Sequence, residues 1–325
     1  MSDIKLGVIG LGHLGSLHAK MLSSAEGAVL EAVYDIDTKT AERIAGEYGG
    51  RVAADLEDML DSVDALSIAT PTSTHFDIAA EAIRRGTPVF LEKPITETVE
   101  QARQLNELSE EHGVIVQVGH IERFNPAIVA LDAYDIAPLF VESHRLSQFN
   151  PRGTDVAVVL DLMIHDIDII LALVKSDVES IDASGIAVVS ESADIANARI
   201  KFTNGCVANI TASRISQNKM RKMRMFQKNA YISIDFLQGL AEVFRLVDPD
   251  DKDVSPTFML GQIDKGTVKR NIVYEQPPVP KDHNPLKHEL QLFVNAVREG
   301  TRPIVDGRAA QQALEVAEEI VRLIS

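Results

Sequence analysis

Short apolar runs alternate with amphipathic helical stretches over the first 120 residues of the chain. The apolar runs lie at residues 4–9, 29–34, 65–69, 89–91 and 114–118. The helical patterns between them lie at residues 16–22, 38–48, 75–85 and 98–112. Strands that alternate with helices are typical of a parallel, doubly wound sheet, so this pattern predicts an α/β domain over residues 1–120.

The rhythm changes after residue 120. A helical segment at residues 156–174 is followed by β-like runs without intervening helices, at residues 181–189, 196–202, 206–212 and 231–236. Such a series predicts a large, open, mostly antiparallel sheet in a C-terminal α+β domain over residues 121–325. Asn204-Gly205 is a hairpin turn signal between two of the runs. Two helices, at residues 285–298 and 307–324, close the sequence.

Composition and charge exclude several classes of protein. The 325 residues suffice for two domains that each bury a core. With 32 basic and 48 acidic side chains, the net charge of −16 repels nucleic acids and anionic membranes, so we expect neither as a partner. Cys206 is the only cysteine, which excludes an intrachain disulfide. The N-terminus lacks a signal-peptide pattern. We therefore expect a soluble cytoplasmic protein.

A glycine-rich turn follows the first apolar run. Gly10, Gly12 and Gly15 fit the pattern G-x-G-x-x-G, which allows a tight turn and a close approach of the backbone to a pyrophosphate. The motif is weak by itself, since an ordinary glycine turn is the alternative. Asp35 ends the next apolar run, where its carboxylate would bind a ribose diol and repel a 2′-phosphate, which favours NAD over NADP. The alternative for Asp35 is a helix N-cap, although Asp37 is better placed for that role.

Further residues follow the later strands of the first domain. Because ligands of doubly wound sheets lie beyond the carboxyl ends of the strands, we expect these residues to face the cofactor. His75 is equally well explained as the start of a helix. The candidate cofactor site comprises Gly10, Gly12, His13, Leu14, Gly15, Asp35, Thr70, Pro71, Thr72, His75, Glu92 and Lys93.

Two segments carry candidate proton chemistry. Lys93, in the run Glu92-Lys93-Pro94, is a candidate general acid or alkoxide stabiliser, with a solvated surface lysine as the alternative. Asp161 and His165 are four residues apart and would share one face of an α-helix. His165 is then a candidate base and Asp161 a candidate orienting group. A metal site that includes Asp168, or a core histidine, is the alternative, and spacing alone does not decide; we expect no metal, because hydride transfer needs none.

Basic side chains gather in the second half of this acidic chain. Residues 214–228 contain Arg214, Lys219, Arg221, Lys222, Arg224 and Lys228 and no acidic residue. Such a block predicts an anion site, while a solvated strand face or a subunit contact is the alternative. Arg145 and Arg152 flank a loop before the helical segment and are further candidates for binding a pyrophosphate.

These motifs, in this order, resemble the glucose-fructose oxidoreductase and inositol dehydrogenase family (Gfo/Idh/MocA). The resemblance rests on residues 10–15, Asp35, Glu92-Lys93-Pro94 and Asp161-x-x-x-His165, and it covers essentially the whole chain. It implies an N-terminal Rossmann domain for a nicotinamide cofactor and a C-terminal domain for substrate binding and oligomerisation. It also implies a catalytic set of Lys93, Asp161 and His165, with either Lys93 or His165 as the base.

Residues 119–126, 144–154, 161–168 and 222–226 look more narrowly like the bacterial UDP-N-acetylglucosamine 3-dehydrogenases. This resemblance implies NAD-dependent oxidation of the C3 hydroxyl of a UDP-sugar, and a downstream aminotransferase that makes a 3-amino sugar for lipid A. The substrate contacts expected are Glu122, Arg123, Asn125, Arg145, Arg152, Arg214, Arg221 and Arg224. A hinge role is the alternative for Asn125-Pro126.

Other activities remain open at this point. They are a dehydrogenase of a UDP-linked hexosaminuronic acid, a dehydrogenase of another sugar or polyol, and a non-catalytic sensor of nucleotide and sugar. We expect a homodimer or homotetramer, since an exposed apolar sheet face is a liability unless another subunit covers it.

Overall fold

The computed structural model describes residues 3–150, 156–250, 258–265, 268–279 and 283–325. The chain divides into two compact units, and each is described here by itself. Unit 1 comprises Met1–Phe124 and Asn284–Glu315, and unit 2 comprises Asn125–His283 and Val316–Ser325. The division expected at residue 120 differs from this one mainly at the C-terminal end. The helix α8 (Pro285–Glu299) and the first part of α9 (Gly307–Ile324) group with unit 1.

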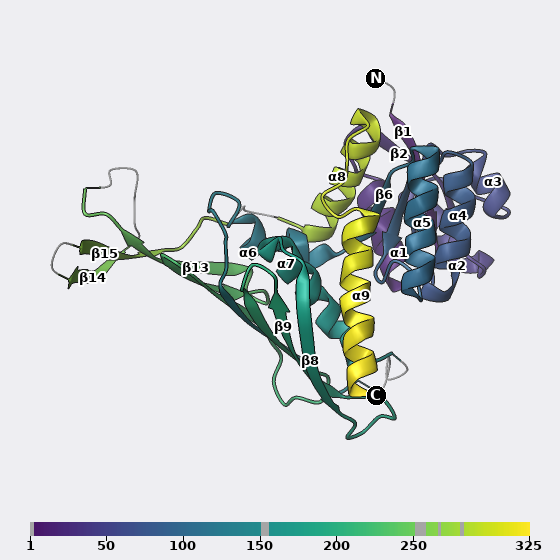
Figure 1. The fold of residues 1–325 in the computed structure, drawn as a ribbon. Helices are drawn as coiled ribbons and strands as arrows, with labels where there is room; N and C mark the ends of the chain where they lie inside the picture. Colours follow the sequence, from purple (N-terminus) through teal and green to yellow (C-terminus); the bar gives the residue numbers. More distant parts are fainter. Residues whose placement is uncertain (1–2, 151–155, 251–257, 266–267, 280–282) are drawn as a thin grey trace. The chain divides into compact units, whose positions relative to one another are not determined.

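A six-stranded parallel sheet forms the centre of the described part of unit 1 (Figure 1). Its strand order is β3-β2-β1-β4-β5-β6, the doubly wound order in which the direction reverses between β1 and β4. This confirms the predicted Rossmann-type sheet. The strands are β1 (Ile4–Ile9), β2 (Ala28–Tyr34), β3 (Arg51–Val52), β4 (Ala65–Ile68), β5 (Val89–Glu92) and β6 (Val116–Gly119).

Helices follow the strands and bury the sheet. They are α1 (His13–Leu22), α2 (Thr38–Tyr48), α3 (Leu56–Leu60), α4 (His75–Arg84) and α5 (Val99–His112), with 3-10 turns at Thr72–Thr74 and Ile121–Phe124. α1, α2 and α8 pack on a core that includes Leu6, Leu22 and Phe293. β4 and β6 are buried at every residue, as expected for a parallel sheet with both faces covered.

The described part of unit 2 contains a nine-stranded sheet, in the order β14-β15-β13-β12-β11-β7-β10-β9-β8. Among the described strands of this sheet, only β7 and β10 pair in parallel, which confirms the predicted mostly antiparallel sheet. The strands are β7 (Phe140–Leu146), β8 (Val178–Ile186), β9 (Ile195–Phe202), β10 (Val207–Ser213), β11 (Met220–Gln227), β12 (Ala230–Asp235), β13 (Leu240–Val247), β14 (Phe258–Lys265) and β15 (Val268–Glu275). The predicted hairpin joins β9 to β10, where Gly205 has a φ of +87°.

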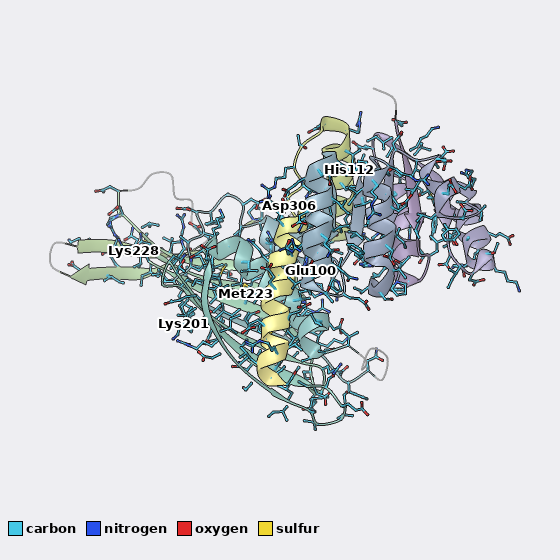
Figure 2. The ribbon with its side chains drawn as sticks, turned by 45° about the vertical axis from the view of Figure 1, so that its right-hand side comes forward. Glu100, His112, Lys201, Met223, Lys228 and Asp306 are labelled. Atoms are coloured by element: carbon cyan, nitrogen blue, oxygen red, sulfur yellow. The ribbon has the colours of Figure 1, made fainter. Side chains whose placement is uncertain are left out.

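The two faces of this sheet differ. Side chains alternate between buried and exposed along β9 and β11, so that Met223 is buried and Lys201 is exposed (Figure 2). The helix α6 (Pro126–Val129) contacts β12 and β13, and α7 (Ile164–Val174) contacts β7 and β10. The face that carries Met223 therefore contributes to the core of unit 2.

The helical segment expected over residues 156–174 is present but starts later and opens with a π-helical turn. Val159–Met163 forms a π-helical turn, and α-helical geometry begins only at Ile164. A π-turn holds more residues per turn than an α-helix, so the periodicity of apolar positions does not reveal it. Within the described residues, no helix is long and apolar enough to cross a membrane.

Candidate active site

The glycine turn of unit 1 requires glycine at two of its three motif positions. Gly10 has a φ of +81°, and a Cβ atom there would lie 2.7 Å from the backbone nitrogen of Thr70. A Cβ atom on Gly15 would lie 1.6 Å from the carbonyl oxygen of Gly10. Gly12, in contrast, borders open space and is the N-cap residue of α1. The first turn of α1 has no acidic residue and no side-chain cap, so its N–H groups suit an anion such as a pyrophosphate.

Asp35 is held at the end of β2 by two backbone donors. The amide of Leu11 donates to Oδ2 at 2.6 Å, and the amide of Asp37 donates to Oδ1 at 2.9 Å. Asp37, rather than Asp35, caps α2, because its carboxylate accepts from the amide of Lys39. Asp35 and Gly12 border the same hollow of about 410 Å³, which His13, Ser16 and Arg43 also line. The residues present therefore fit the ribose and pyrophosphate of a dinucleotide. Leu14 is 46% exposed beside this turn.

His75 begins α4 and joins two of the expected cofactor loops. Its ring is buried, with Nε2 at 3.0 Å from the carbonyl oxygen of Thr70 and Nδ1 at 3.1 Å from that of Pro94. Burial lowers the pKa of His75, although the backbone carbonyls of Thr70, Pro94 and Ile95 oppose this effect. Thr72 starts the intervening 3-10 turn after Pro71. These contacts favour a structural role for His75 at the point where β4 and β5 end.

Sequence reasoning missed a buried hydrogen-bonded chain beside the predicted motif. His18 on α1 lies between Ser67 of β4, at 2.8 Å from Nδ1, and Glu92 of β5, at 2.9 Å from Nε2. His18 is fully buried, and its ring makes a T-shaped contact with that of Phe90, at 5.4 Å between the ring centroids. A Cβ atom on Gly119 would lie only 3.1 Å from the nearer oxygen of the Glu92 carboxylate, a tight contact. The available signal was the position of His18, one turn after Gly15 on the helix face that covers the sheet.

Lys93 follows β5 directly and is partly buried, and its peptide bond to Pro94 is cis. The two neighbours of Lys93 are thus fixed within unit 1, Glu92 by His18 and Pro94 by His75. The structure gives Lys93 a defined backbone at the carboxyl edge of the parallel sheet, where doubly wound folds bind ligands.

Asp161 and His165 belong to unit 2. Asp161 lies in the π-turn and is exposed, whereas His165 lies in the first turn of α7 and is partly buried. A π-turn holds slightly more residues per turn than an α-helix, so residues four apart still lie on about the same face, and the expected shared face of Asp161 and His165 stays a prediction. Asp166 and Asp168, next in sequence, are both buried. In the residues that the structure describes, no three histidine, cysteine or acidic side chains are grouped as a metal site would require.

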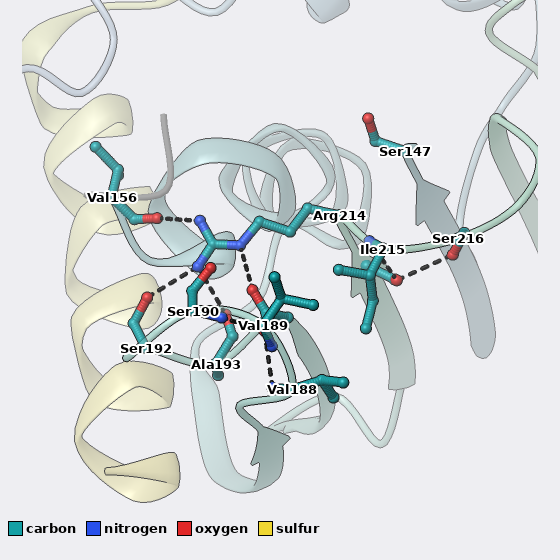
Figure 3. Close-up of polar contacts among 12 residues, drawn as sticks. Ser147, Val156, Val188, Val189, Ser190, Ser192, Ala193, Arg214, Ile215 and Ser216 are labelled. Carbon is teal, nitrogen blue, oxygen red and sulfur yellow. Dashed lines mark hydrogen bonds and ion pairs between the residues drawn. The ribbon is translucent and has the colours of Figure 1, made fainter. Parts of the chain in front are cut away.

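Two predicted substrate arginines are buried in ion pairs. Arg145 on β7 donates from Nε and Nη2 to the two carboxylate oxygens of Asp166, at 2.8 and 3.1 Å. Arg214 donates from Nε to Asp194 at 2.9 Å and from Nη1 to the carbonyl oxygen of Val156 at 2.7 Å (Figure 3). These contacts favour internal roles for both arginines.

The structure divides the basic block between the two faces of the sheet. Arg221 pairs in register with Arg145, so its side chain starts on the same face. Arg224 is on the outer face, 54% exposed and 3.9 Å from Glu142, which fits the alternative of a solvated strand face. Lys222 is also on the outer face, 3.3 Å from Asp235. Arg152 lies outside the described residues.

The segment that links the units contains the other predicted substrate contacts. Glu122 is buried in the 3-10 turn after β6, and Arg123 next to it is partly buried. Asn125 caps α6, accepting from the amide of Ala127 and donating to the carbonyl oxygen of Phe236 at 3.1 Å. These contacts support the structural alternative for Asn125.

Comparison with known proteins shows which family this chain resembles in sequence. Residues 4–120 match a family model described as an oxidoreductase family with an NAD-binding Rossmann fold, and residues 139–232 match the GFO/IDH/MocA C-terminal domain. The UDP-N-acetylglucosamine 3-dehydrogenase of Acidithiobacillus ferrooxidans is 38% identical over 75% of this chain and 78% of that protein. The scyllo-inositol 2-dehydrogenase (NAD(+)) of Bacillus subtilis is 29% identical over 97% and 92%.

Solved structures agree with the sequence matches. The structure of the Acidithiobacillus ferrooxidans 3-dehydrogenase has a TM-score of 0.88 and 33% identity, over 100% of this chain and 98% of that chain. A levoglucosan dehydrogenase, at 18% identity and a TM-score of 0.83, shares the fold. With its parallel and antiparallel sheets and its motifs matched over both units, this chain belongs to the GFO/IDH/MocA family of oxidoreductases.

Proposed function

We propose that the protein oxidises the C3 hydroxyl of UDP-N-acetylglucosamine to the 3-keto nucleotide sugar, with NAD⁺ as the hydride acceptor. The observation that carries this proposal is the 38% identity and full-length structural similarity to an enzyme of that name. The site residues are compatible with it, because unit 1 offers a dinucleotide cradle and both units offer proton-transfer side chains.

NAD rather than NADP is proposed because of Asp35. Its carboxylate, fixed by the amides of Leu11 and Asp37, suits a ribose diol and repels a 2′-phosphate. The N–H groups at the start of α1 would hold the pyrophosphate. When bound, NAD⁺ supplies the acceptor for the hydride. Comparison of kcat/KM with NAD⁺ and NADP⁺ tests this choice, and an equal or higher value with NADP⁺ contradicts it.

The proton chemistry is assigned to three side chains. His165 takes the proton of the C3 hydroxyl, Asp161 orients the hydroxyl and the imidazole, and Lys93 stabilises the negative charge that develops on the oxygen. Arg221 is the candidate for the diphosphate, since it starts on the face of the sheet that carries Arg145. The opposite assignment makes Lys93 the base.

The test is a near-stoichiometric reaction of enzyme, NAD⁺ and UDP-N-acetylglucosamine, followed by absorbance at ~340 nm, where reduced nicotinamide absorbs. A high enzyme concentration detects product even when the ketone equilibrium is unfavourable. We expect a rise with this substrate and none with the corresponding UDP-uronate, free N-acetylglucosamine or myo-inositol. A rise with only one of those three compounds would identify that compound as the substrate instead. No rise with any of the four compounds would favour the alternative of a non-catalytic sensor.

Variants test the catalytic assignment. Lys93→Met and His165→Ala should each lower kcat by about 100-fold or more, the range of a lost general acid or base. Lys20→Met and His112→Ala serve as controls, because both side chains are exposed on helices of unit 1. Near wild-type turnover in both active-site variants would contradict the assignment, while the pH dependence of kcat in each identifies the base.

The 3-keto product indicates which class of reaction would come next. The C3 ketone of the nucleotide sugar is a substrate for a pyridoxal-dependent aminotransferase, which would make a 3-amino sugar of the lipid A type.

A homo-oligomer is supported by a ladder of aromatic rings across the outer sheet face, with neighbouring centroids 5.0–6.1 Å apart. Its members are Phe140, Phe226, Tyr231, Phe244, Tyr274 and Phe258. Light scattering of the wild type and of Phe226→Lys measures the assembly, and a monomeric wild type contradicts it.

A further inference from the structure

A buried, two-point ion pair joins β7 to the helix that carries His165. The Arg145 and Asp166 side chains are each 2% exposed, and two nitrogens of one meet the two oxygens of the other. The guanidinium also lies 5.7 Å from the centre of the Phe236 ring. Two parallel hydrogen bonds fix orientation as well as distance. Because Asp166 adjoins His165 in sequence, this pair fixes the rotation of α7 about its axis at the site residue.

A second buried arginine holds the chain before the π-turn. Arg214 donates to the carbonyl oxygen of Val156, to Oγ of Ser192 at 2.8 Å and to Asp194 (Figure 3). Asp194 is fully buried, and its other oxygen accepts from three successive amides, those of Val188, Val189 and Ser190. Arg214 is therefore itself held rigidly, and it anchors the backbone at Val156.

The two arginines emerge from neighbouring parallel strands on the same side. Arg145 pairs in register with Ala212 of β10, and Arg214 is the first residue after β10. Residues 145 and 212 share the buried face because they pair in register, and the Arg214 side chain beyond the end of β10 is buried as well. The segment from Val156 to Asp166 is thus attached at both of its ends to the carboxyl ends of two neighbouring central strands, β7 and β10.

The π-turn lies between these two anchors. Val159–Met163 contains Asp161, and His165 follows in the first turn of α7. π-turns inside helices are rare and frequently occur at functional sites. Buried ion pairs are also weak sources of stability compared with apolar packing, so two of them around one short segment point to a role in specifying its geometry.

We infer that Arg145 and Arg214 are positioning residues, which hold the π-turn so that Asp161 and His165 present their side chains together. They act through Asp166 and Val156 and do not bind the diphosphate of the substrate. This inference rests on the proposed function for the role of Asp161 and His165. It removes Arg145 and Arg214 from the expected substrate contacts and leaves Arg221 as the candidate on that face.

Kinetics separate positioning from substrate binding. Arg145→Lys and Arg214→Lys keep the charge but cannot reproduce the several directed hydrogen bonds of each guanidinium. We expect kcat to fall by about 100-fold, the effect of a misplaced reacting group, while Kd for UDP stays within about threefold. Arg245→Lys is the control, because Arg245 on β13 makes a two-point pair with Glu275 that is less buried, at 33% and 9% exposure, and lies several strands away from β7. A loss of UDP affinity that exceeds the loss of kcat would overturn the inference.

A double substitution separates positioning from stability. Arg145→Met together with Asp166→Leu replaces the buried pair by apolar side chains, which other proteins tolerate without loss of stability. We expect an unchanged melting temperature with kcat about 100-fold lower, because the apolar pair does not fix the rotation of α7. A double variant that folds and keeps wild-type kcat would overturn the inference.

Hydrogen exchange tests the positioning role of Arg145 and Arg214 without a measurement of turnover. Amides of residues 156–166 should exchange faster in Arg145→Lys and Arg214→Lys than in the wild type or in Arg245→Lys, measured without substrate. Unchanged exchange in both variants overturns the positioning role, even if the proposed reaction is observed. Faster exchange together with no turnover of UDP-N-acetylglucosamine by the wild type supports the anchors and contradicts the proposed function.

Discussion

Unit 1 and unit 2 hold their candidate site residues by different kinds of interaction. In unit 1, close backbone contacts and hydrogen bonds fix the loops: the tight packing at Gly10 and Gly15, the carbonyl oxygens around His75 and the hydrogen-bonded chain through His18 to Glu92. In unit 2, buried ion pairs of Arg145 and Arg214 fix the segment of Asp161 and His165. One site thus depends on close backbone packing, and the other depends on charge.

The difference follows from the two sheets. A parallel sheet covered on both faces brings strand ends and helix starts so close together that backbone groups meet directly. The mostly antiparallel sheet of unit 2 carries a helical segment on one face, and only long side chains reach from its strands to that segment. Steric changes should therefore harm unit 1 most, and charge changes should harm unit 2 most.

The first prediction tests the steric side of this comparison. Gly15→Ala should lower the free energy of unfolding by more than about 4 kcal/mol or prevent folding, because its Cβ would lie 1.6 Å from a backbone oxygen. Gly12→Ala should keep its melting temperature, because a Cβ atom there meets nothing within 4 Å. It should weaken NADH binding, because the added methyl group borders the hollow proposed for the dinucleotide. Circular dichroism and NADH titration measure the two effects. A stable Gly15→Ala variant contradicts the close-packing account.

The second prediction tests the charged side. Burial raises the pKa of Asp194, but the amides of Val189, Ser190 and Val188 overcome this and hold it well below its usual value. The carboxylate therefore contributes stability at neutral pH that is lost as the pH falls below about 4, where the unfolded state takes up a proton first.

Asp194→Asn removes this charge and leaves Arg214 buried without its ion-pair partner. We expect a loss of about 3 kcal/mol at pH 7 and a shallower dependence of stability on acid pH. Urea unfolding followed by circular dichroism at pH 7, pH 4 and pH 3 measures both quantities. Asp264→Asn is the control, because Asp264 belongs to an exposed pair, with Lys269. Equal stability of the two variants at pH 7 argues against the role of buried charge.

The third prediction concerns the neutral contacts of His75. Because burial lowers its pKa, the unfolded state binds the proton more readily, and stability should fall as the pH drops below about 6.5. His75→Gln should reduce this fall by about 1 kcal/mol per pH unit, near the limit for one titrating group. Melting temperatures between pH 7.5 and pH 5 measure it, with the exposed His112→Gln as control. The same slope in both variants would remove His75 as its source.

The smallest effect is expected where a glycine serves neither packing nor a turn. Gly46 lies on the exposed side of α2, and a Cβ atom there meets nothing within 4 Å. Gly46→Ala should stabilise the protein by about 1 kcal/mol through helix propensity. Gly49→Ala, at the end of the same helix with a φ of +90°, should destabilise it instead. Thermal unfolding compares the two, and a stabilising Gly49→Ala contradicts this interpretation.

The sequence predicted the features whose signals are local. The glycine turn, the strand that ends at Asp35 and the helix cap at Asp37 each depend on residues that are close along the chain. The antiparallel sheet and the turn at Gly205 were predicted for the same reason. β7 and β11 were not named from the sequence, because charged and polar residues on their outer faces obscure the alternation.

The candidate site was predictable in its residue types and less so in their contacts. His18 gave no motif by itself, and its partners Ser67 and Glu92 are distant in sequence. Arg145 and Arg214 resembled anion ligands because the sequence does not show that Asp166 and Asp194 lie beside them. The π-turn was missed because its apolar residues also fit an α-helix.

The sequence by itself determined the two kinds of sheet, the dinucleotide turn and the family, since hydrophobic period and glycine positions act over short stretches of chain. The tertiary structure decided which charges are partners and which face each basic residue takes. Arg221 and Arg224 are three residues apart, yet strand alternation puts them on opposite faces. The physical reason is that pairing, burial and desolvation depend on distances in space, which residues far apart in sequence acquire only in the folded chain.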